Sequence, residues 1–261
     1  MSATLGGLIK DYRLQKNISQ LEVVFALGWK EPSRLSRIEQ GRVGNPSREF
    51  IDKLITVLKL SEEEKNELLY TGNYLPTEEE ISKIREKVDP LIRKWPYPII
   101  VYDFSWRVVH INKISSYIYQ FDQIMGEKIS ESLPNILEVI FHPNNHYLKG
   151  MKLTQLHNFL MTIILQFKSI QRTRTKGTWY INLIRKMMND DLFRRLWKES
   201  DKVQEEEKPI DIYERLSVIH NGNAIEPLNF HFFSLPLLKD RRFYIEYYIP
   251  ADMETMRYFK K

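Results

Sequence analysis

The chain has 261 residues, a net charge of +5, 43% hydrophobic and 12% aromatic residues, and no cysteine. This composition excludes a disordered chain. The length is sufficient for two folded domains. The lack of cysteine excludes disulfides, thiol catalysis and the usual zinc fingers. No apolar run reaches the roughly 18 residues of a membrane span, and the first residues do not form a signal peptide. We therefore expect a cytoplasmic protein without a membrane partner.

Residues 18–41 have the pattern of two short helices joined by a turn. Ser19 can cap the first helix, and Glu22, three residues later, completes a capping box. Gly28 permits a sharp turn at the end of that helix. Pro32 suits the first turn of the next helix, where its missing N–H costs nothing. This arrangement predicts a helix-turn-helix.

The second of these helices is expected to turn a polar side to solvent. Leu35 and Ile38 have the spacing of a buried face. Such a helix enters the DNA major groove, where Arg can bind guanine in a bidentate way. The expected base-reading residues are Ser33, Arg34 and Arg37, and phosphate binding is the alternative for either arginine. Further DNA contacts are expected from Lys30, Ser36, Arg42, Asn45 and Arg48, the last three to phosphate.

Basic residues are in local excess around this motif. Residues 1–60 contain ten Lys or Arg against six Asp or Glu. Because neutralisation of phosphates supplies most of the affinity for DNA, this local excess is a better indicator of DNA binding than the modest total charge. It favours double-stranded DNA as the partner.

The same segment resembles the lambda-repressor-like, Xre-type DNA-binding family. The matching residues are Ser19-Gln20, Gly28 and Ile38-Glu39-Gln40-Gly41. The resemblance implies an all-α domain over residues 1–74, with Gln20 on the DNA backbone and a structural ion pair between Arg13 and Glu39. Its five helices are expected at Leu5–Lys16, Ser19–Leu27, Pro32–Gln40, Ser47–Leu58 and Ser61–Tyr70. The turn before Pro32 holds one residue more than the family pattern.

A helix over residues 77–94 is expected to follow this domain. Thr77 is a good N-cap, and the three glutamates after it suit a first helical turn. We assign residues 75–94 to a connecting helix, which serves either as a conduit for a signal or as a spacer. Residues 95–261 then form the second domain.

The second domain has an α+β pattern. The expected strands are Pro98–Phe104, Arg107–Ile111, Ile212–His220, Ile225–Leu235 and Arg242–Ile249. The expected helices are Asn112–Tyr119, Pro134–Phe141, Thr154–Thr173, Thr178–Met188 and Asp190–Lys198. The charged run Asp201–Lys208 indicates a solvated loop or helix end. This order predicts an antiparallel sheet of about five strands, with helices covering one face in a PAS-like arrangement.

This half resembles the MmyB-like ligand-binding domain that follows an Xre-type head in bacterial regulators. The resemblance rests on residues 98–112, 135–141, 191–197 and 247–251. A cavity between helices and sheet would favour a small, largely apolar ligand with one polar anchor, similar to a fatty acid. Plain core packing is the alternative for each candidate. The candidates are Tyr102, Phe141, Phe159, Ile163, Phe167, Trp197, Phe230, Phe232 and Tyr247.

A basic run without an intervening acid extends over two expected helices and the linker that joins them. Its members are Lys168, Arg172, Arg174, Lys176, Arg185 and Lys186. A cation from this run at the mouth of a pocket would hold a carboxylate or phosphate. A solvated helix face and a second DNA-facing patch are the alternatives.

Catalysis finds little support in the sequence. There is no His-Glu-x-x-His motif, phosphate-binding glycine loop or nucleophile elbow. His142 and His146 are four residues apart, but the intervening Pro143 indicates a loop, so we expect no metal and no cofactor. The sequence predicts a non-enzymatic regulator that binds operator DNA as a homodimer and senses a small apolar ligand. The alternative is a second domain that serves only dimerisation or binding of a partner protein.

Overall fold

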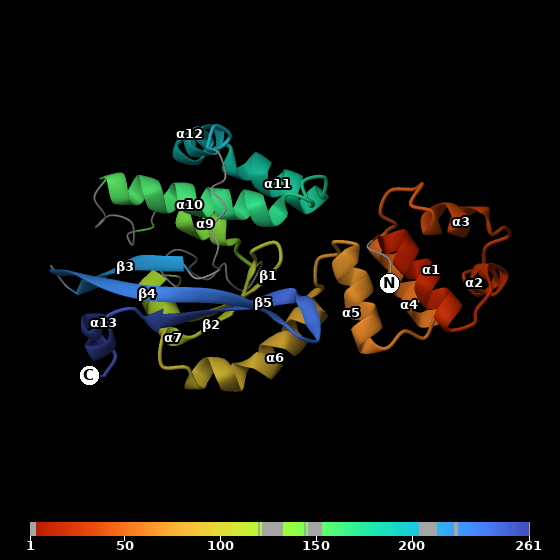
Figure 1. Cartoon of the computed structure of the whole chain (residues 1–261), viewed down its shortest axis with the longest axis horizontal. Helices are drawn as coiled ribbons and strands as arrows, with labels where there is room; N and C mark the ends of the chain where they lie inside the picture. The colour runs from red at the N-terminus through yellow and green to blue at the C-terminus, as the bar shows by residue number, and fades with distance from the viewer. Residues whose placement is uncertain are drawn as a thin grey trace. The chain divides into compact units, whose positions relative to one another are not determined.

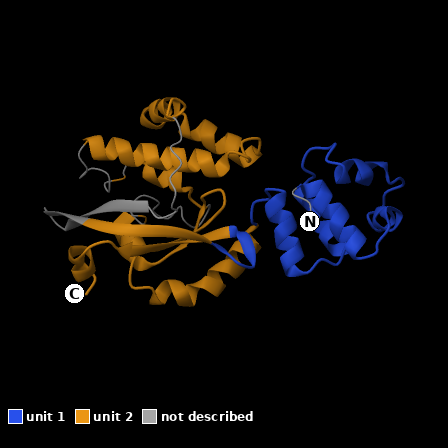
Figure 2. Ribbon diagram, in the orientation of Figure 1, with its two compact units in different colours: residues 1–76, 236–242 blue, residues 77–235, 243–261 orange. Residues whose placement is uncertain are grey.

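The computed structural model describes residues 4–119, 121, 133–143, 145, 153–203, 213–221 and 224–260. The chain divides into two compact units (Figure 2). The first contains Met1–Pro76 and Pro236–Arg242, and the second contains Thr77–Leu235 and Phe243–Lys261. Within the described residues, no helix combines the length and the apolar character needed to cross a bilayer.

Within residues 4–76, all of which are described, five helices follow one another (Figure 1). They are α1 Leu5–Gln15, α2 Gln20–Ala26, α3 Ser33–Glu39, α4 Arg48–Val57 and α5 Glu62–Thr71. The predicted ends differ by at most one residue, mostly because the predicted ranges include the capping residues. The all-α helix-turn-helix region predicted from the sequence is confirmed.

Serine side chains cap the N-termini of three of these helices, α2, α4 and α5. Ser19 and Ser61 each accept a hydrogen bond from the backbone N–H three residues on. The glutamates at those positions are Glu22 and Glu64, and the carboxylate of each accepts a hydrogen bond from the backbone N–H of the serine. These reciprocal bonds satisfy N–H groups that have no partner inside the helix, and so fix where each helix starts.

Helix α1 lies very close to the end of α3. A Cβ atom built on Gly6 would lie 2.1 Å from the backbone oxygen of Ile38. Only glycine allows the two backbones to approach this closely. Buried Leu8, Ile9 and Tyr12 of α1 join the core of the unit beside this contact.

The second unit contains an antiparallel sheet with the strand order β2-β1-β5-β4-β3. The strands are β1 Ile99–Asp103, β2 Val108–Ile111, β3 Tyr213–Asn221, β4 Ala224–Leu237 and β5 Asp240–Pro250. Strand β1 pairs with both β2 and β5, and its Tyr102 lies opposite Tyr244 of β5. An antiparallel sheet accompanied by helices confirms the α+β class predicted for this half.

The helices of this unit lie on both sides of the sheet (Figure 1). Helices α9 to α12 lie on one side and α6 on the other, where it contacts β2. The bounds are α6 Glu78–Lys94, α7 Lys113–Tyr119, α9 Ile136–Ile140, α10 Leu153–Gln171, α11 Thr178–Met187, α12 Asp191–Ser200 and α13 Met253–Tyr258. Helix α13, which is capped by Asp252, has no counterpart among the predicted helices.

The sequence predicted helices over one face of the sheet, and the structure has helices on both faces (Figure 1). All five residues of β1 are buried, so both faces of this strand need a cover. Helix α6 packs against the neighbouring strand β2 on the second side, and its Ile81, Val88 and Ile92 are buried. Arg85 of α6 also donates from Nε to the carbonyl oxygen of Val109 in β2, at 2.7 Å. The helix expected as a connection is therefore part of the layered core of the second unit.

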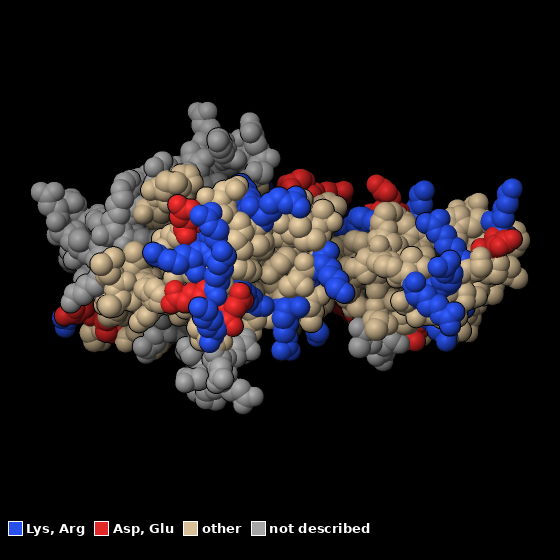
Figure 3. Space-filling model, turned by 90° about the horizontal axis from the view of Figure 1, so that it is seen from above, with Lys and Arg blue, Asp and Glu red and all other residues tan. Residues whose placement is uncertain are grey.

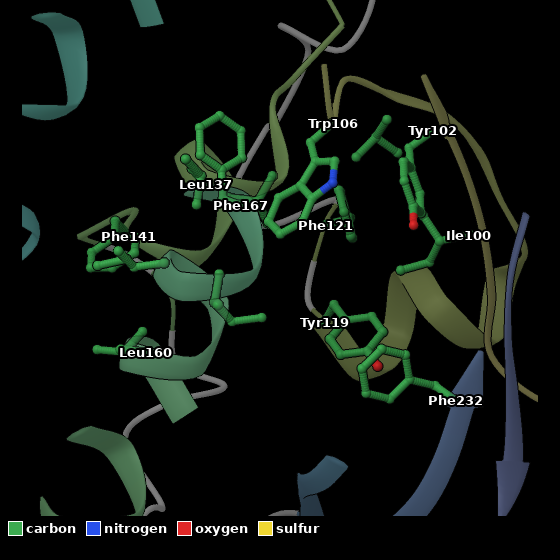
Figure 4. Close-up of a cluster of buried hydrophobic side chains, with 14 of the residues drawn as sticks. Ile100, Tyr102, Trp106, Tyr119, Phe121, Leu137, Phe141, Leu160, Phe167 and Phe232 are labelled. Atoms are coloured by element: carbon green, nitrogen blue, oxygen red, sulfur yellow. The ribbon is translucent and has the colours of Figure 1, made fainter. Parts of the chain in front are cut away.

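The core beneath α10 is strongly aromatic (Figure 4). The rings of Trp106 and Phe167 meet edge to face, with centroids 5.2 Å apart. Tyr248 of β5 contacts Phe230 and Phe232 of β4, with centroids 5.8 and 5.7 Å away. Of the residues discussed above, His146, the part of the charged run after residue 203, and Ile212 at the start of a predicted strand lie outside the described residues.

Candidate nucleic-acid interface and interior cavity

Helix α3 has one buried and one exposed face. Leu35 and Ile38 are buried in the core of the first unit. Ser33, Arg34 and Arg37 are exposed. The three side chains predicted to read bases therefore share the solvent side of one helix, as insertion into a DNA groove requires.

The turn between α2 and α3 has the form expected at a glycine-ended helix. Gly28 has a φ of +71°, and the N–H of Trp29 donates to the carbonyl of Val24. Helix α3 then begins at Ser33. The sequence analysis placed Pro32 inside the first helical turn, whereas it occupies the N-cap position, one residue earlier.

Trp29 in this turn holds one of the predicted base-reading arginines. Its ring is stacked on Phe50, with centroids 5.2 Å apart and planes 9° from parallel. The guanidinium carbon of Arg34 lies 4.5 Å from the centroid of the Trp29 ring. A cation–π contact of this kind limits where the guanidinium can lie. No role was predicted for Trp29, because a large aromatic residue within a turn is by itself no indication of a DNA contact.

A single carboxylate connects the first three helices. Glu39, at the end of α3, accepts hydrogen bonds from Arg13 of α1, with Nε to Oε1 at 2.6 Å and Nη2 to Oε2 at 3.0 Å. Gln20, the first residue of α2, donates from Nε2 to the same Oε2 at 2.7 Å. Arg13 and Glu39 are only 7% and 6% exposed. Because the pair is buried and bidentate, it fixes the geometry of α3 without any contribution from DNA.

Basic side chains gather on one face of the first unit (Figure 3). Lys30 and Arg42, at either end of α3, are exposed like Arg34 and Arg37. Ser36 is half-buried and accepts a hydrogen bond from Gln40 within the helix. The surroundings of α3 thus have the local positive charge that phosphate contacts need.

Asn45 and Arg48 have bonds within the domain. Asn45 donates from Nδ2 to the carbonyl oxygen of Gly72 at 2.8 Å. Arg48 donates from Nε to Asp52 at 2.9 Å and from Nη1 to the carbonyl oxygen of Leu75 at 3.2 Å. Both side chains therefore tie the start of α4 to the chain around the end of α5, and a phosphate contact would have to be made in addition.

A cavity of about 300 Å³ lies in the second unit between α10 and the sheet. Its walls are mainly aromatic, with a few hydroxyl and amide groups. The lining residues are Tyr102, Phe104, Trp106, Gln166, Ser169, Ile170, Phe232, Ser234 and Tyr244. A volume of this size is at the lower end of those that hold small organic ligands.

Two of the nine predicted ligand residues, Tyr102 and Phe232, line this cavity. Phe159 lines a second, smaller cavity of about 40 Å³. Trp106 and Tyr244 of the larger cavity were not predicted. In the sequence, Trp106 is a residue of a turn and Tyr244 is one of several tyrosines in a strand, and neither pattern indicates a ligand site.

The remaining candidates line neither of these two cavities. Phe141 and Trp197 pack against Phe193, with centroids 5.1 and 5.2 Å away. Tyr247 contacts Trp95 and Phe233, at 5.1 and 5.4 Å. The other three candidates, Ile163, Phe167 and Phe230, are buried residues of the core.

Members of the basic run have different surroundings. Lys168 donates to Asp201 at 2.6 Å, and Lys186 forms an ion pair with Glu138 at 2.5 Å. Arg174 instead lies over the ring of Phe104, with its guanidinium carbon 4.9 Å from the centroid. Arg174 is therefore the member of this run that contacts a wall of the larger cavity.

The five helices, the capped turn and the exposed face of α3 define a helix-turn-helix domain. A family model described as a helix-turn-helix domain matches residues 4–68. The comparison with curated proteins gives no match. The matched segment contains all the residues predicted to contact DNA, and it supports a DNA-binding regulator of the Xre-like kind.

Proposed function

We propose that the chain is a sequence-specific, non-enzymatic transcriptional regulator that binds operator DNA as a homodimer in the cytoplasm. The observation that carries this proposal is the exposed row of Ser33, Arg34 and Arg37 on α3. The buried carboxylate of Glu39 anchors the same helix. A rigid helix with outward arginines matches the chemistry of guanine recognition in the major groove.

Dimerisation follows from the geometry of recognition. One short helix contacts only a few base pairs, and helix-turn-helix proteins reach specificity by placing two such helices on half-sites one helical turn apart. We assign residues 1–74 to DNA binding, 75–94 to a helix that continues into the second domain, and 95–261 to a PAS-like, MmyB-like domain for dimerisation and ligand binding.

We assign ligand sensing to the cavity beneath α10. A domain used only for dimerisation or partner binding needs no pocket under α10, whereas a volume of about 300 Å³ with several polar groups in its lining favours a small ligand. Binding would change DNA affinity by stabilising one arrangement of the two heads over another.

Selection from random duplexes tests this function. Repeated rounds of binding by the full-length chain should enrich a motif with two-fold symmetry and a half-site spacing near one helical turn. The same selection with Arg34 and Arg37 both changed to alanine should enrich no motif. Enrichment of no motif by the wild-type chain would refute sequence-specific binding, and an asymmetric single site would refute the dimer.

A further inference from the structure

Trp106 occupies a backbone position that a tryptophan rarely adopts. It follows β1 in the turn to β2 and has a φ of +69°, in the left-handed region that favours glycine or asparagine. The turn is held by Asp103, whose Oδ1 accepts from Ser105 N and Oγ, and whose Oδ2 accepts from Arg107 Nε at 2.7 Å. A large residue kept in a strained conformation by its surroundings is a mark of functional positioning.

Trp106 lines the larger cavity, and its indole nitrogen is a covered donor beside that wall. The residue is 5% exposed, and its indole N–H has no acceptor among the described residues. Figure 4 shows the ring between Phe167 and Tyr102, with its nitrogen turned to the side of Tyr102. Tyr102 and Trp106 both line the cavity. A buried N–H without an acceptor is costly, so an acceptor from a ligand would be strongly favoured there.

The cavity walls are flat. Tyr102 and Tyr244 stack with planes 10° apart, and Phe104 and Phe232 add further aromatic rings to the lining. Faces of this kind prefer planar rings to flexible chains, because ring stacking adds to the gain from burial. The volume of about 300 Å³ suits a ligand of one or two rings.

Polar groups near the cavity favour an anion. None of the nine lining residues is acidic, whereas Ser169, the hydrogen-bonded hydroxyl pair of Tyr102 and Ser234, and the Trp106 N–H offer donors. Arg174 adds a positive charge beside the wall, since it lies over Phe104 and donates from Nη1 to the carbonyl oxygen of Ile170 at 3.1 Å. Hydrogen bonds from a guanidinium and an indole to a carboxylate are stronger than those to a neutral oxygen.

From these observations we propose that the cavity binds a planar aromatic carboxylate, with its ring packed against the stacked pair of Tyr102 and Tyr244 and its carboxylate accepting from Trp106 and Arg174. This assignment rests on the proposed ligand-sensing function and names its ligand class. It departs from a fatty-acid-like ligand, because the walls are flat and aromatic rather than a long aliphatic channel.

Calorimetric titration of the full-length chain with three probes tests the ligand class. The probes are 2-naphthoate, 2-naphthalenemethanol, which keeps the rings and lacks the charge, and decanoate, which keeps the charge and lacks the rings. We expect one 2-naphthoate per chain, bound at least about tenfold more tightly than either comparison probe.

Matched variants test the residues. Trp106→Phe should weaken 2-naphthoate at least about tenfold, while Trp95→Phe removes a second buried indole N–H, which lies outside the cavity lining, and should change nothing. Arg174→Gln should weaken 2-naphthoate and leave 2-naphthalenemethanol unchanged. Arg172→Gln, an exposed neighbour, is its control. Circular dichroism of each variant establishes that it is folded.

The outcomes separate this inference from the broader function. Tighter binding of decanoate than of 2-naphthoate would overturn the aromatic class and leave ligand sensing standing. Absence of 2-naphthoate binding by the folded chain, or equal binding by wild type and Trp106→Phe, would overturn the inference. Enrichment of an operator is measured without any probe, so DNA-binding regulation stands or fails independently.

Discussion

Arg13 and Glu39 form a buried, bidentate ion pair that joins the first helix to the end of the third, with N–O distances of 2.6 and 3.0 Å. Gln20 at the start of α2 shares the same carboxylate. The predicted recognition helix is therefore held by the buried carboxylate of Glu39. Contact with DNA and support of the fold are divided between different faces of α3.

Removing one partner of this pair should be strongly destabilising. Glu39→Gln leaves the buried guanidinium of Arg13 without its counter-charge, and we expect a loss of about 3–5 kcal/mol in the free energy of unfolding. Urea unfolding followed by circular dichroism measures it. The double variant Arg13→Met, Glu39→Leu should lose less than the single variant, because no buried charge remains unpaired. Equal stability of Glu39→Gln and wild type would contradict this role.

Trp29 should affect DNA affinity without touching DNA. Trp29→Ala removes the ring over which Arg34 lies, so we expect about two- to fivefold weaker binding to the selected operator, the value of an exposed cation–π contact. Trp29→Phe keeps an aromatic face and should retain most of the affinity. Fluorescence anisotropy with a labelled duplex measures both, and an unchanged affinity of Trp29→Ala would show that the stack is dispensable.

Arg37 and Arg42 should respond differently to substitution. Arg37→Ala is expected to lose discrimination between operator and random duplex, with little change in the dependence of affinity on salt. Arg42→Ala should weaken both duplexes alike and lower the salt slope by about one. Titrations of both duplexes at several salt concentrations make the comparison. Uniform weakening by Arg37→Ala would assign that residue to phosphate instead.

The capping box of α2 predicts a dependence on pH. Hydrogen bonds from the side chain and backbone of Ser19 hold the pKa of Glu22 below its ordinary value of 4.5. A lowered pKa in the folded state means that the ionised carboxylate stabilises the fold above pH 4.5, and that this contribution is lost as the pH falls through the lower value. The Tm of wild type should therefore exceed that of Glu22→Gln at neutral pH, and the two should converge in acid.

Thermal unfolding of both proteins from neutral to acidic pH tests this sign. Glu63→Gln, in the first turn of α5 but outside its capping box, is the matched control and should show a smaller difference. A difference between wild type and Glu22→Gln that grows in acid would be opposite to the expectation.

The first domain was predictable because its signals are local. Caps such as Ser19, the left-handed glycine at Gly28 and the spacing of Leu35 and Ile38 each depend on a few neighbouring residues. The role of Trp29 was not predictable, because its stack on Phe50 joins residues 21 positions apart, and no local pattern encodes that pairing.

The second domain was predicted at the level of segments but not of layers. The buried residues of β1 do not alternate with polar ones, and this continuous pattern was the sign of a strand covered on both faces. The cavity was harder to foresee, since Trp106 and Phe232 meet there only through the fold. Aromatic residues that line a cavity and those that fill a core look alike in a sequence.

Phe232 and Phe230 offer a comparison of cavity wall and core. Phe232 lines the cavity, whereas Phe230 lines neither described cavity and is fully buried. Phe232→Leu should weaken 2-naphthoate binding with a modest loss of stability, because part of its ring faces existing space. Phe230→Leu should lower stability and leave affinity unchanged. Calorimetry and thermal unfolding of both variants test this, and a stability loss alone for Phe232→Leu would assign it to the core.

The most direct test of the account is the ratio of affinities for the selected operator and a scrambled duplex at one salt concentration. Wild-type protein should prefer the operator by roughly a thousandfold or more, as specific DNA-binding proteins do. The double variant Arg34→Ala, Arg37→Ala should bind both duplexes with nearly equal affinity while remaining folded. A wild-type ratio near one, or a ratio unchanged in the double variant, would contradict recognition by α3.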